Sequence, residues 1–365
     1  MKAIGSCAVK AVCLVLLSAV ALCGQEQVSP PVVPLALKDY APQSMLKVSR
    51  SEVQKTKYPA IDFHNHITDE KLEPLIAAMD ACNIRVVVNY SGGFGAALKE
   101  EIARESTYPG RFIAFANIDW STIDAPDFSQ RAVRQLEEDV KAGARGLKIF
   151  KELGLTVKNK SGALVHVDDP RLDAVWEKAG DLGIPVVIHV SDPDAFFLPV
   201  DRRNERYDEL QEHPDWSFYG PPYPSKRELL EERNRVIARH PRTTFVGLHV
   251  ANHPEDLAEV GRWLDRYPNL QVEIGARLNE LGRQPYTSRK FFLKYADRIM
   301  FGIDTAPSQV YYVAYIRYLE TFDEYFSYSP IEGQQGRWNI YGIGLPDDVL
   351  EKVYWKNAAK LLRLK

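Results

Sequence analysis

The chain has 365 residues, of which 45% are hydrophobic and 26% charged, and its formal net charge is −3. These values are typical of a soluble globular protein with a large core. Lysine and arginine are spread along the chain without a basic cluster, so the sequence gives no indication of nucleic-acid binding.

The first segment, residues 1–24, is predicted to be a secretory signal peptide. Two lysines precede the apolar run Ala11–Leu22, and residues 19–21 form a small-residue cleavage site. An uncleaved membrane anchor is one alternative to this interpretation. Lipidation of Cys23 is another, which the leucine just before it disfavours. We therefore expect an exported protein, periplasmic or extracellular, without a membrane span.

The remainder divides into a predicted linker or extended arm at residues 25–50 and one folded domain at residues 51–365. The linker contains four prolines and no clear period. Cys82 is the only cysteine beyond the signal segment, so the domain can form no intrachain disulfide. Its apolar helical surroundings predict a buried side chain.

Within the domain, short β-rich runs alternate with longer amphipathic stretches. We predict eight strands, at Ala60–His64, Arg85–Asn89, Phe112–Ile118, Gly146–Phe150, Val186–Val190, Thr244–His249, Leu270–Ile274 and Arg298–Ile303. Helical spacing marks intervening helices at 72–79, 133–140, 169–183, 228–237 and 255–264. The alternation predicts an α/β fold with a parallel sheet, which we interpret as a (β/α)₈ TIM-type barrel. A doubly wound open sheet is the competing arrangement.

Three later segments stand out. Residues 191–224, after the fifth strand, form a long loop rich in aromatic and charged residues, which is typical of a lid or binding loop. Tyr311–Gly342 is aromatic and weakly periodic, and no helix is predicted there. Asp347–Leu362 is predicted to be a final helix on the outside or bottom of the barrel.

The first strand carries a His-x-His pair, His64 and His66. Residues two apart in a strand point to the same side, so both imidazoles can face one ion, and neutral imidazole is a good ligand for Zn²⁺. His189, His249 and Asp304 stand at the ends of the fifth, sixth and eighth strands. The carboxyl ends of barrel strands meet at one face, where active sites lie. A single histidine there is more often structural, but five residues together predict a site.

This pattern resembles the amidohydrolase superfamily, and most closely its branch of mostly single-metal hydrolases and decarboxylases. The resemblance extends from about Tyr58 to the C-terminus. It rests on Asp62-Phe63-His64-Asn65-His66, on the strand-end histidines, on Phe301-Gly302-Ile303-Asp304 and on Asn357-Ala358-Ala359-Lys360-Leu361-Leu362. It implies that His64, His66, His189 and Asp304 are the metal ligands. His249 would polarise the substrate, and Asp304 would also accept a proton from the activated water.

Lys148 on the fourth strand leaves the number of ions open. Some two-metal members of the superfamily use a carboxylated lysine at this position, whereas others have a different residue and one metal. From the sequence, Lys148 could equally point into the mouth of the barrel or form an ion pair with a neighbouring strand. We expect one divalent transition metal, Zn²⁺, and leave two ions open.

The function expected is that of an exported metal-dependent hydrolase, in which a metal-activated water attacks an ester, lactone or amide. The alternative is metal-dependent non-oxidative decarboxylation of a hydroxy-aromatic or related acid. A binding protein without turnover is disfavoured because no ligand is missing. The substrate is expected to be a small molecule, and a homo-oligomer is compatible with the sequence. Four residues of the long loop are candidate substrate contacts: Arg203, Arg206, Trp216 and Tyr219.

Overall fold

The computed structural model describes residues 34–36, 39–40, 42–328 and 335–364, and the predicted signal peptide lies outside these residues. The chain divides into two units, Met1–Lys47 and Val48–Lys365. Every described residue of the first unit is exposed. Within the described ranges, no helix has the length and apolar character needed to cross a membrane. The division into signal, arm and barrel domain stays a prediction.

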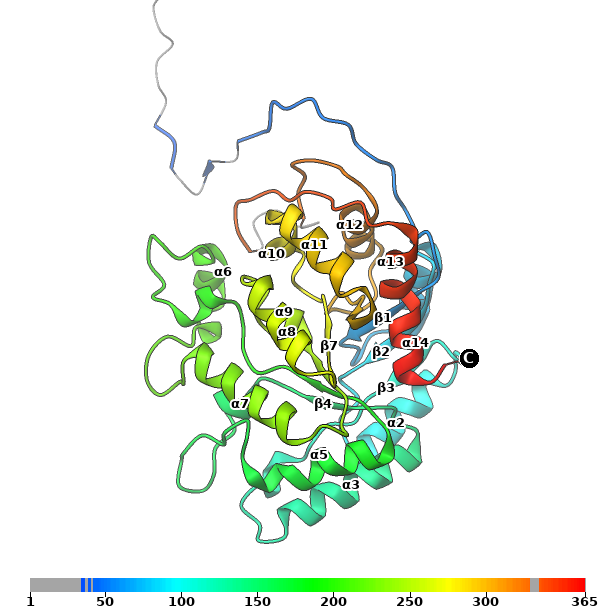
Figure 1. Ribbon diagram of the computed structural model, residues 1–365, viewed down its shortest axis with the longest axis vertical. Coiled ribbons are helices and arrows are strands. Elements are labelled where there is room, and N and C mark those ends of the chain that lie inside the picture. Colours follow the sequence, from blue (N-terminus) through cyan, green and yellow to red (C-terminus); the bar gives the residue numbers. More distant parts are fainter. Residues whose placement is uncertain (1–33, 37–38, 41, 329–334, 365) are drawn as a thin grey trace, which may run out of the picture. The chain divides into compact units, whose positions relative to one another are not determined.

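Eight parallel strands form the centre of the second unit (Figure 1). One sheet has the order β1-β2-β3 and the other the order β4-β5-β6-β7-β8. Each strand begins within one residue of its predicted start, and several are shorter than predicted. Their bounds are β1 Ala60–Asn65, β2 Ile84–Asn89, β3 Phe112–Ala114, β4 Leu147–Ile149, β5 Val186–Ile188, β6 Phe245–Gly247, β7 Leu270–Glu273 and β8 Ile299–Met300.

Backbone hydrogen bonds join the two sheets at both edges. At one edge the Ala116 N–H donates to Gly146 O at 2.9 Å, and Lys148 N–H donates to Ala116 O at 2.8 Å. At the other, Phe63 N–H donates to Phe301 O at 2.9 Å. Neighbouring strands are therefore connected all the way round, in chain order. This confirms the predicted (β/α)₈ TIM-type fold and excludes the doubly wound sheet, whose strand order reverses at a switch point.

Helices separate the strands, and all the predicted ones are present. They correspond to α1 Leu72–Ala81, α3 Phe128–Ala142, α5 Asp173–Leu182, α7 Lys226–Arg239 and α9 Leu257–Arg266. The predicted final helix is α13 Asp347–Glu351 and α14 Asn357–Leu362, joined by a π-helical turn at Lys352–Lys356. The helices that were not predicted include α2 Gly95–Glu105, α10 Leu278–Arg283, α11 Pro285–Lys294 and α12 Gln309–Glu320.

The prediction for Tyr311–Gly342 was wrong in one respect, because α12 occupies the start of this segment. Its buried residues include three tyrosines, Tyr312, Tyr315 and Tyr318. A polar hydroxyl on each buried ring obscures the apolar stripe by which an amphipathic helix is identified. The 191–224 loop holds only short helical turns, at Asp194–Phe197, Tyr207–Glu212 and Pro214–Trp216.

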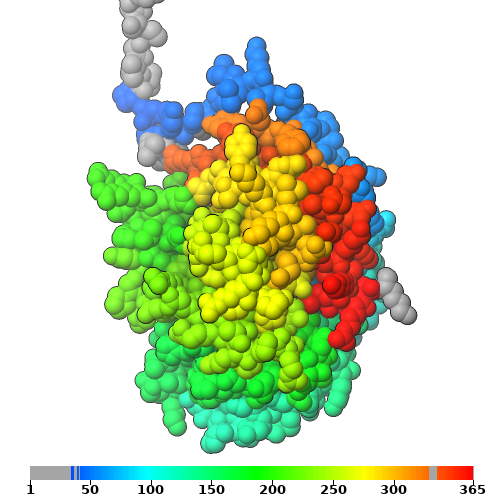
Figure 2. Space-filling model, in the orientation of Figure 1, coloured from blue at the N-terminus to red at the C-terminus, as the bar shows by residue number. Residues whose placement is uncertain are grey.

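The apolar side chains form two layers. Side chains that face outward from the strands, such as Val186 and Phe245, pack against the helices. Those that face inward, such as Val187 and Val246, fill the barrel together with Ala358 and other residues of α14. This alternation is the period-two pattern of a strand. The final helix thus packs against the inward-facing side chains of the barrel. In Figure 1, α13 and α14 lie at the right of the strands, near β1 and β2, and in Figure 2 the red C-terminal segment lies beside the yellow and orange segment that follows β7. The opposite end of the strands is left for a site.

Candidate metal centre

The His-x-His pair lies at the end of β1, where the strand departs from regular pairing. The register of β1 on β2 shifts between Asp62 and Asn65. Such a bulge redirects the side chains that follow it. Asp62 anchors the deviation, because it accepts hydrogen bonds from Ile303 N–H at 3.1 Å and from the Tyr312 hydroxyl at 2.8 Å. The bulge lets His64 turn toward the carboxyl end of the barrel.

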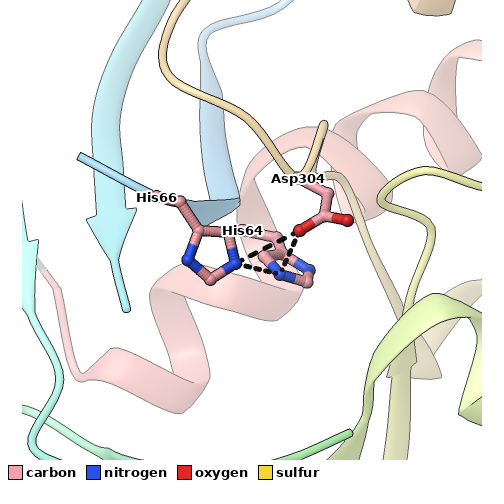
Figure 3. Close-up of side chains that lie close together, drawn as sticks. All are labelled: His64, His66 and Asp304. Atoms are coloured by element: carbon pink, nitrogen blue, oxygen red, sulfur yellow. Dashed lines mark hydrogen bonds and ion pairs between the residues drawn. The ribbon is translucent and has the colours of Figure 1, made fainter. Parts of the chain in front are cut away.

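Three side chains converge there (Figure 3). The Nε2 atoms of His64 and His66 are 3.2 Å apart. Asp304 Oδ1 lies 2.8 Å from His64 Nε2 and 3.2 Å from His66 Nε2. Burial by itself would raise the pKa of Asp304, but the neighbouring His64 and His249 hold it well below its usual range. Asp304 is therefore an ionised acceptor beside two imidazole nitrogens.

The other ring nitrogens of the pair have separate partners. His66 Nδ1 lies 2.9 Å from Ser91 Oγ. His64 Nδ1 lies 3.0 Å from Glu273 Oε1, in an ion-pair contact rather than a well-aligned hydrogen bond. Partners of this kind orient histidine ligands and keep Nε2 free for a metal. Burial also lowers the pKa of His66, which favours the neutral form that binds metals.

These residues fit a divalent transition metal. Two imidazole nitrogens and one carboxylate oxygen point at a common position, and each histidine is held from behind by an oxygen atom. This is a donor set suited to Zn²⁺ and similar ions. Without an ion, the three mutual contacts between these atoms cannot all be good hydrogen bonds, because no single arrangement of protons supplies a separate donor to each of them. A metal at this position would explain the convergence.

His249 follows β6 in an unusual backbone conformation. Its φ is 56°, and Val250, Ala251 and Asn252 also have positive φ. Left-handed geometry is costly for side chains other than glycine, especially for β-branched valine. Glu273 stabilises this turn by accepting the His249 N–H at 2.6 Å. His249 Nδ1 lies 2.8 Å from Gly275 O, so it carries the proton and Nε2 is the free acceptor.

His189 lies beside His249 rather than within the group of three. Its Nδ1 is 3.3 Å from His249 Nε2, and its Nε2 is 3.4 Å from Asp192 Oδ1. Burial lowers the pKa of His189 to about 4, so the ring is neutral. Asp192 in turn forms an ion pair with Lys151 at 2.5 Å. The structure thus brings His189 to the site, while its assignment as a fourth ligand stays a prediction.

Lys148 is buried inside the barrel without a charged partner. Its Nζ atom has no hydrogen bond among the described residues and lies 4.9 Å from the Tyr90 ring and 4.7 Å from the Phe150 ring. Burial lowers its pKa to about 8. The ion pair considered from the sequence is not found in the described part of the chain. A metal-bridging role for Lys148 stays a prediction.

A cavity of about 440 Å³ opens beside the three converging residues. Its wall includes Asp304, His189 and His249, and it has a size typical of a small-molecule site. Of the four candidate substrate contacts, Arg206 and Trp216 line it and Arg203 and Tyr219 do not. Both cavity-lining residues already have partners: Arg206 is paired with Glu209 and Glu280, and Trp216 stacks on His213.

Two residues at the end of β7 were missed by sequence reasoning, Glu273 and Arg277. Both are at most 5% exposed, and each belongs to the site by its contacts or its position in the cavity wall. One signal was available: an acidic residue in the apolar run Leu270–Ile274 requires a buried partner. The seventh strand, like the second and third, had no assigned site residue, although its carboxyl end must open at the same face.

Comparisons with known proteins agree on the fold. A protein-family model described as Amidohydrolase matches residues 61–364. A 2,6-dihydroxybenzoate decarboxylase is similar with a TM-score of 0.54 and 16% identity, over 84% of this chain and 100% of that one. A TIM-barrel protein from Bordetella bronchiseptica has a TM-score of 0.53 and 19% identity, over 83% and 98%. An amidohydrolase from Burkholderia multivorans has a TM-score of 0.50 and 14% identity, over 84% and 99%. No curated protein matches the sequence.

Proposed function

We propose that this chain, which belongs to the amidohydrolase family, is a metal-dependent hydrolase of an ester, lactone or amide. Members of this family are enzymes that depend on a metal. The observation that carries the proposal is the convergence of His64 Nε2, His66 Nε2 and Asp304 Oδ1 beside the cavity. In the proposal, a single Zn²⁺ ion is held by these atoms and by His189.

The position of the proton on the His189 ring supports its proposed role as a metal ligand. His249 Nδ1 donates to Gly275 O, so its Nε2 atom accepts and the facing Nδ1 of neutral His189 must donate. The Nε2 atom of His189 then keeps its lone pair, and no hydrogen bond satisfies it. A buried nitrogen with a free lone pair is suited to a metal.

A divalent ion at this position would lower the pKa of a water molecule toward neutrality and so supply the nucleophile. Residues of the chain would carry out the proton transfers. Asp304 is ionised and can accept the proton through Oδ2, the oxygen that faces His249 Nδ1 at 3.9 Å. His249 is held in place by Glu273 and Gly275, and because its Nδ1 proton is bound by Gly275 O it can act only through Nε2. In the proposal, Nε2 receives the proton that Asp304 took from the water and passes it to the developing oxyanion. Trp216 and Phe196 stack on each other and contribute an apolar part of the cavity wall.

Export forms part of the proposal. The apolar run Ala11–Leu22 behind two lysines supports a cleaved secretory signal. A substrate available outside the cytoplasm would follow from it.

The test combines metal analysis with a substrate screen. Purified protein should contain a transition metal, and His66→Ala should weaken metal binding by more than the roughly 100-fold that loss of an outer partner costs. His66 is preferred to the fully buried His64 because its side chain is 31% exposed, so the fold should survive, as circular dichroism can verify. His240→Gln is the control, since His240 is paired with Asp173 on the outer helices.

The metal-loaded enzyme is then screened on lactones, esters and hydroxybenzoates. Release of acid from a lactone or ester, abolished by His66→Ala and retained by His240→Gln, is the expected result. Release of CO₂ from a hydroxybenzoate instead would show the alternative reaction, decarboxylation. An unchanged metal content in His66→Ala would exclude the proposed ligand set.

A further inference from the structure

Arg277, at the cavity end of β7, carries a buried positive charge that no carboxylate among the described residues pairs with. It is 5% exposed. Its side chain makes one hydrogen bond, from Nη1 to Ala276 O at 2.6 Å, and Nε makes none. Among the residues that the structure describes, no carboxylate lies within ion-pair distance of it. A guanidinium group stays protonated in proteins, so this charge cannot be relieved by loss of the proton.

The other buried arginines show how this chain normally treats such a charge. Arg206, on the same cavity wall, is paired with both Glu209 and Glu280. Arg233, outside the cavity, donates to Ala251 O and Asn234 Oδ1 and lies over the Trp263 ring. Burying a charge without a partner is energetically unfavourable. Arg277 therefore lacks a partner that a bound molecule could provide.

The position of Arg277 connects it to the candidate metal centre. It lines the cavity together with His249 and Asp304, and it follows Gly275, whose carbonyl holds the His249 ring. Burial lowers the pKa of His249 well below its usual range, and the positive charge of Arg277 contributes to the lowering. A molecule in this cavity would meet the guanidinium and the metal centre at the same time.

We propose that Arg277 binds a carboxylate of the substrate, so that the enzyme acts on an anionic ester, lactone or amide in preference to a neutral one. This inference rests on the proposed function. A guanidinium fork matches a carboxylate in geometry and charge, and such bonds are stronger than neutral ones. A monoanion matches this one guanidinium, because the other two cations that line the cavity among the described residues, Arg206 and Lys151, are already paired with Glu209 and Asp192.

Binding of inert probes tests the inference without turnover. Benzoate and benzamide have nearly the same shape and differ in charge. Calorimetry on the zinc-loaded protein should show benzoate binding tighter than benzamide. In Arg277→Met, affinity for benzoate should fall by about 10- to 100-fold, the range for a hydrogen bond to a charged group, while that for benzamide stays unchanged. Arg277→Lys should recover part of the preference, because it keeps the charge and loses the fork.

Arg283→Met is the matched control. Arg283 lies on α10, which directly follows Arg277, but it is paired with Glu205 and does not line the cavity. It should leave both affinities unchanged. An equal loss of affinity for both probes in Arg277→Met, or no loss of affinity for either, would overturn the inference. A failure of benzoate to bind the wild type would overturn it as well. A purely structural arginine would lower thermal stability without changing the ratio of the two affinities.

The same variants separate this inference from the proposed function. Mono-4-nitrophenyl succinate and 4-nitrophenyl butyrate are an anionic and a neutral ester of similar size. Hydrolysis of both with a ratio of kcat/KM that Arg277→Met leaves unchanged would refute the inference and support the hydrolase. A benzoate preference that depends on Arg277, in a protein that binds no metal, would support the inference and refute the proposed function.

Discussion

Glu273 connects the metal centre to the backbone through a single carboxylate. It contacts His64 Nδ1 at 3.0 Å and accepts the N–H groups of His249 and Gly275, each at 2.6 Å. Burial would raise its pKa, but the adjacent His64 and these hydrogen bonds hold it below the usual value. One ionised residue therefore orients a proposed ligand and supports the turn that carries the proposed acid.

Replacing Glu273 with glutamine tests this double role. The amide keeps one acceptor but turns an NH₂ group toward one of the donors. We expect a 10- to 100-fold loss of metal affinity, typical of an outer partner, measured by competition with a chelator. The free energy of unfolding should fall by about 1–3 kcal/mol, because a buried donor is left unsatisfied.

Glu232→Gln is the control for this prediction. Glu232 is also buried, and it contacts His166 Nδ1 at 2.6 Å and accepts the Val167 N–H at 2.9 Å, away from the candidate metal centre. The Glu232→Gln variant should lower the free energy of unfolding by a similar amount without changing the rate of hydrolysis. A metal affinity that is identical in Glu273→Gln and the wild type would show that Glu273 is only structural.

At the scale of elements, three neighbouring strands end in left-handed backbone. His249 after β6, Ala276 after β7 and Asp304 after β8 have φ values of 56°, 52° and 65°. Strain of this kind is found where surrounding structure holds functional residues in place. All three positions lie at the rim of the cavity.

Ala276 is the position where this strain can be relieved most simply. Glycine adopts positive φ without a Cβ clash, so Ala276→Gly should raise the free energy of unfolding by up to about 1 kcal/mol. Ala103→Gly, at an exposed position in α2 with ordinary helical geometry, should lower it by about 0.5–1 kcal/mol. Urea unfolding of both variants measures the difference. The same sign of change in both would contradict the account.

At the scale of the whole molecule, the proposed metal would connect the first strand of the barrel to the last. His64 and His66 come from the first strand, and Asp304 follows the last. The Asp304 N–H also donates to His64 O at 2.8 Å across the same seam. A ligand that binds only the folded state stabilises it according to its free concentration and affinity.

Removal of the metal should therefore lower Tm. At a free metal concentration 100 times Kd, the bound metal adds about 2.7 kcal/mol to the free energy of unfolding. Loss of this contribution corresponds to a decrease in Tm of several degrees for a domain of this size. Scanning calorimetry with and without a chelator measures it. His66→Ala should melt at the same temperature under both conditions. An equal shift in that variant would mean that the metal binds elsewhere.

The sequence by itself determined the order and type of the elements and the rim on which the site lies. Strand runs such as Val186–Ile188 are recognised from local composition, and the rule that parallel strands end at one face places His64, His189, His249 and Asp304 together. These inferences depend on local periodicity and on one property of the fold, so they need no knowledge of particular contacts.

Only the tertiary structure decided which charges are satisfied and which are free. Arg206, a candidate substrate contact from the sequence, is paired with Glu280, 74 positions further along the chain. Arg277, which no sequence pattern marks, has no carboxylate partner within the described residues. Glu273 became part of the site through contacts to His64 and His249 on other strands. Pairing between residues distant in sequence depends on how the strands are staggered and how the loops close over them. A local sequence pattern gives no information on the stagger of the strands or on the closure of the loops.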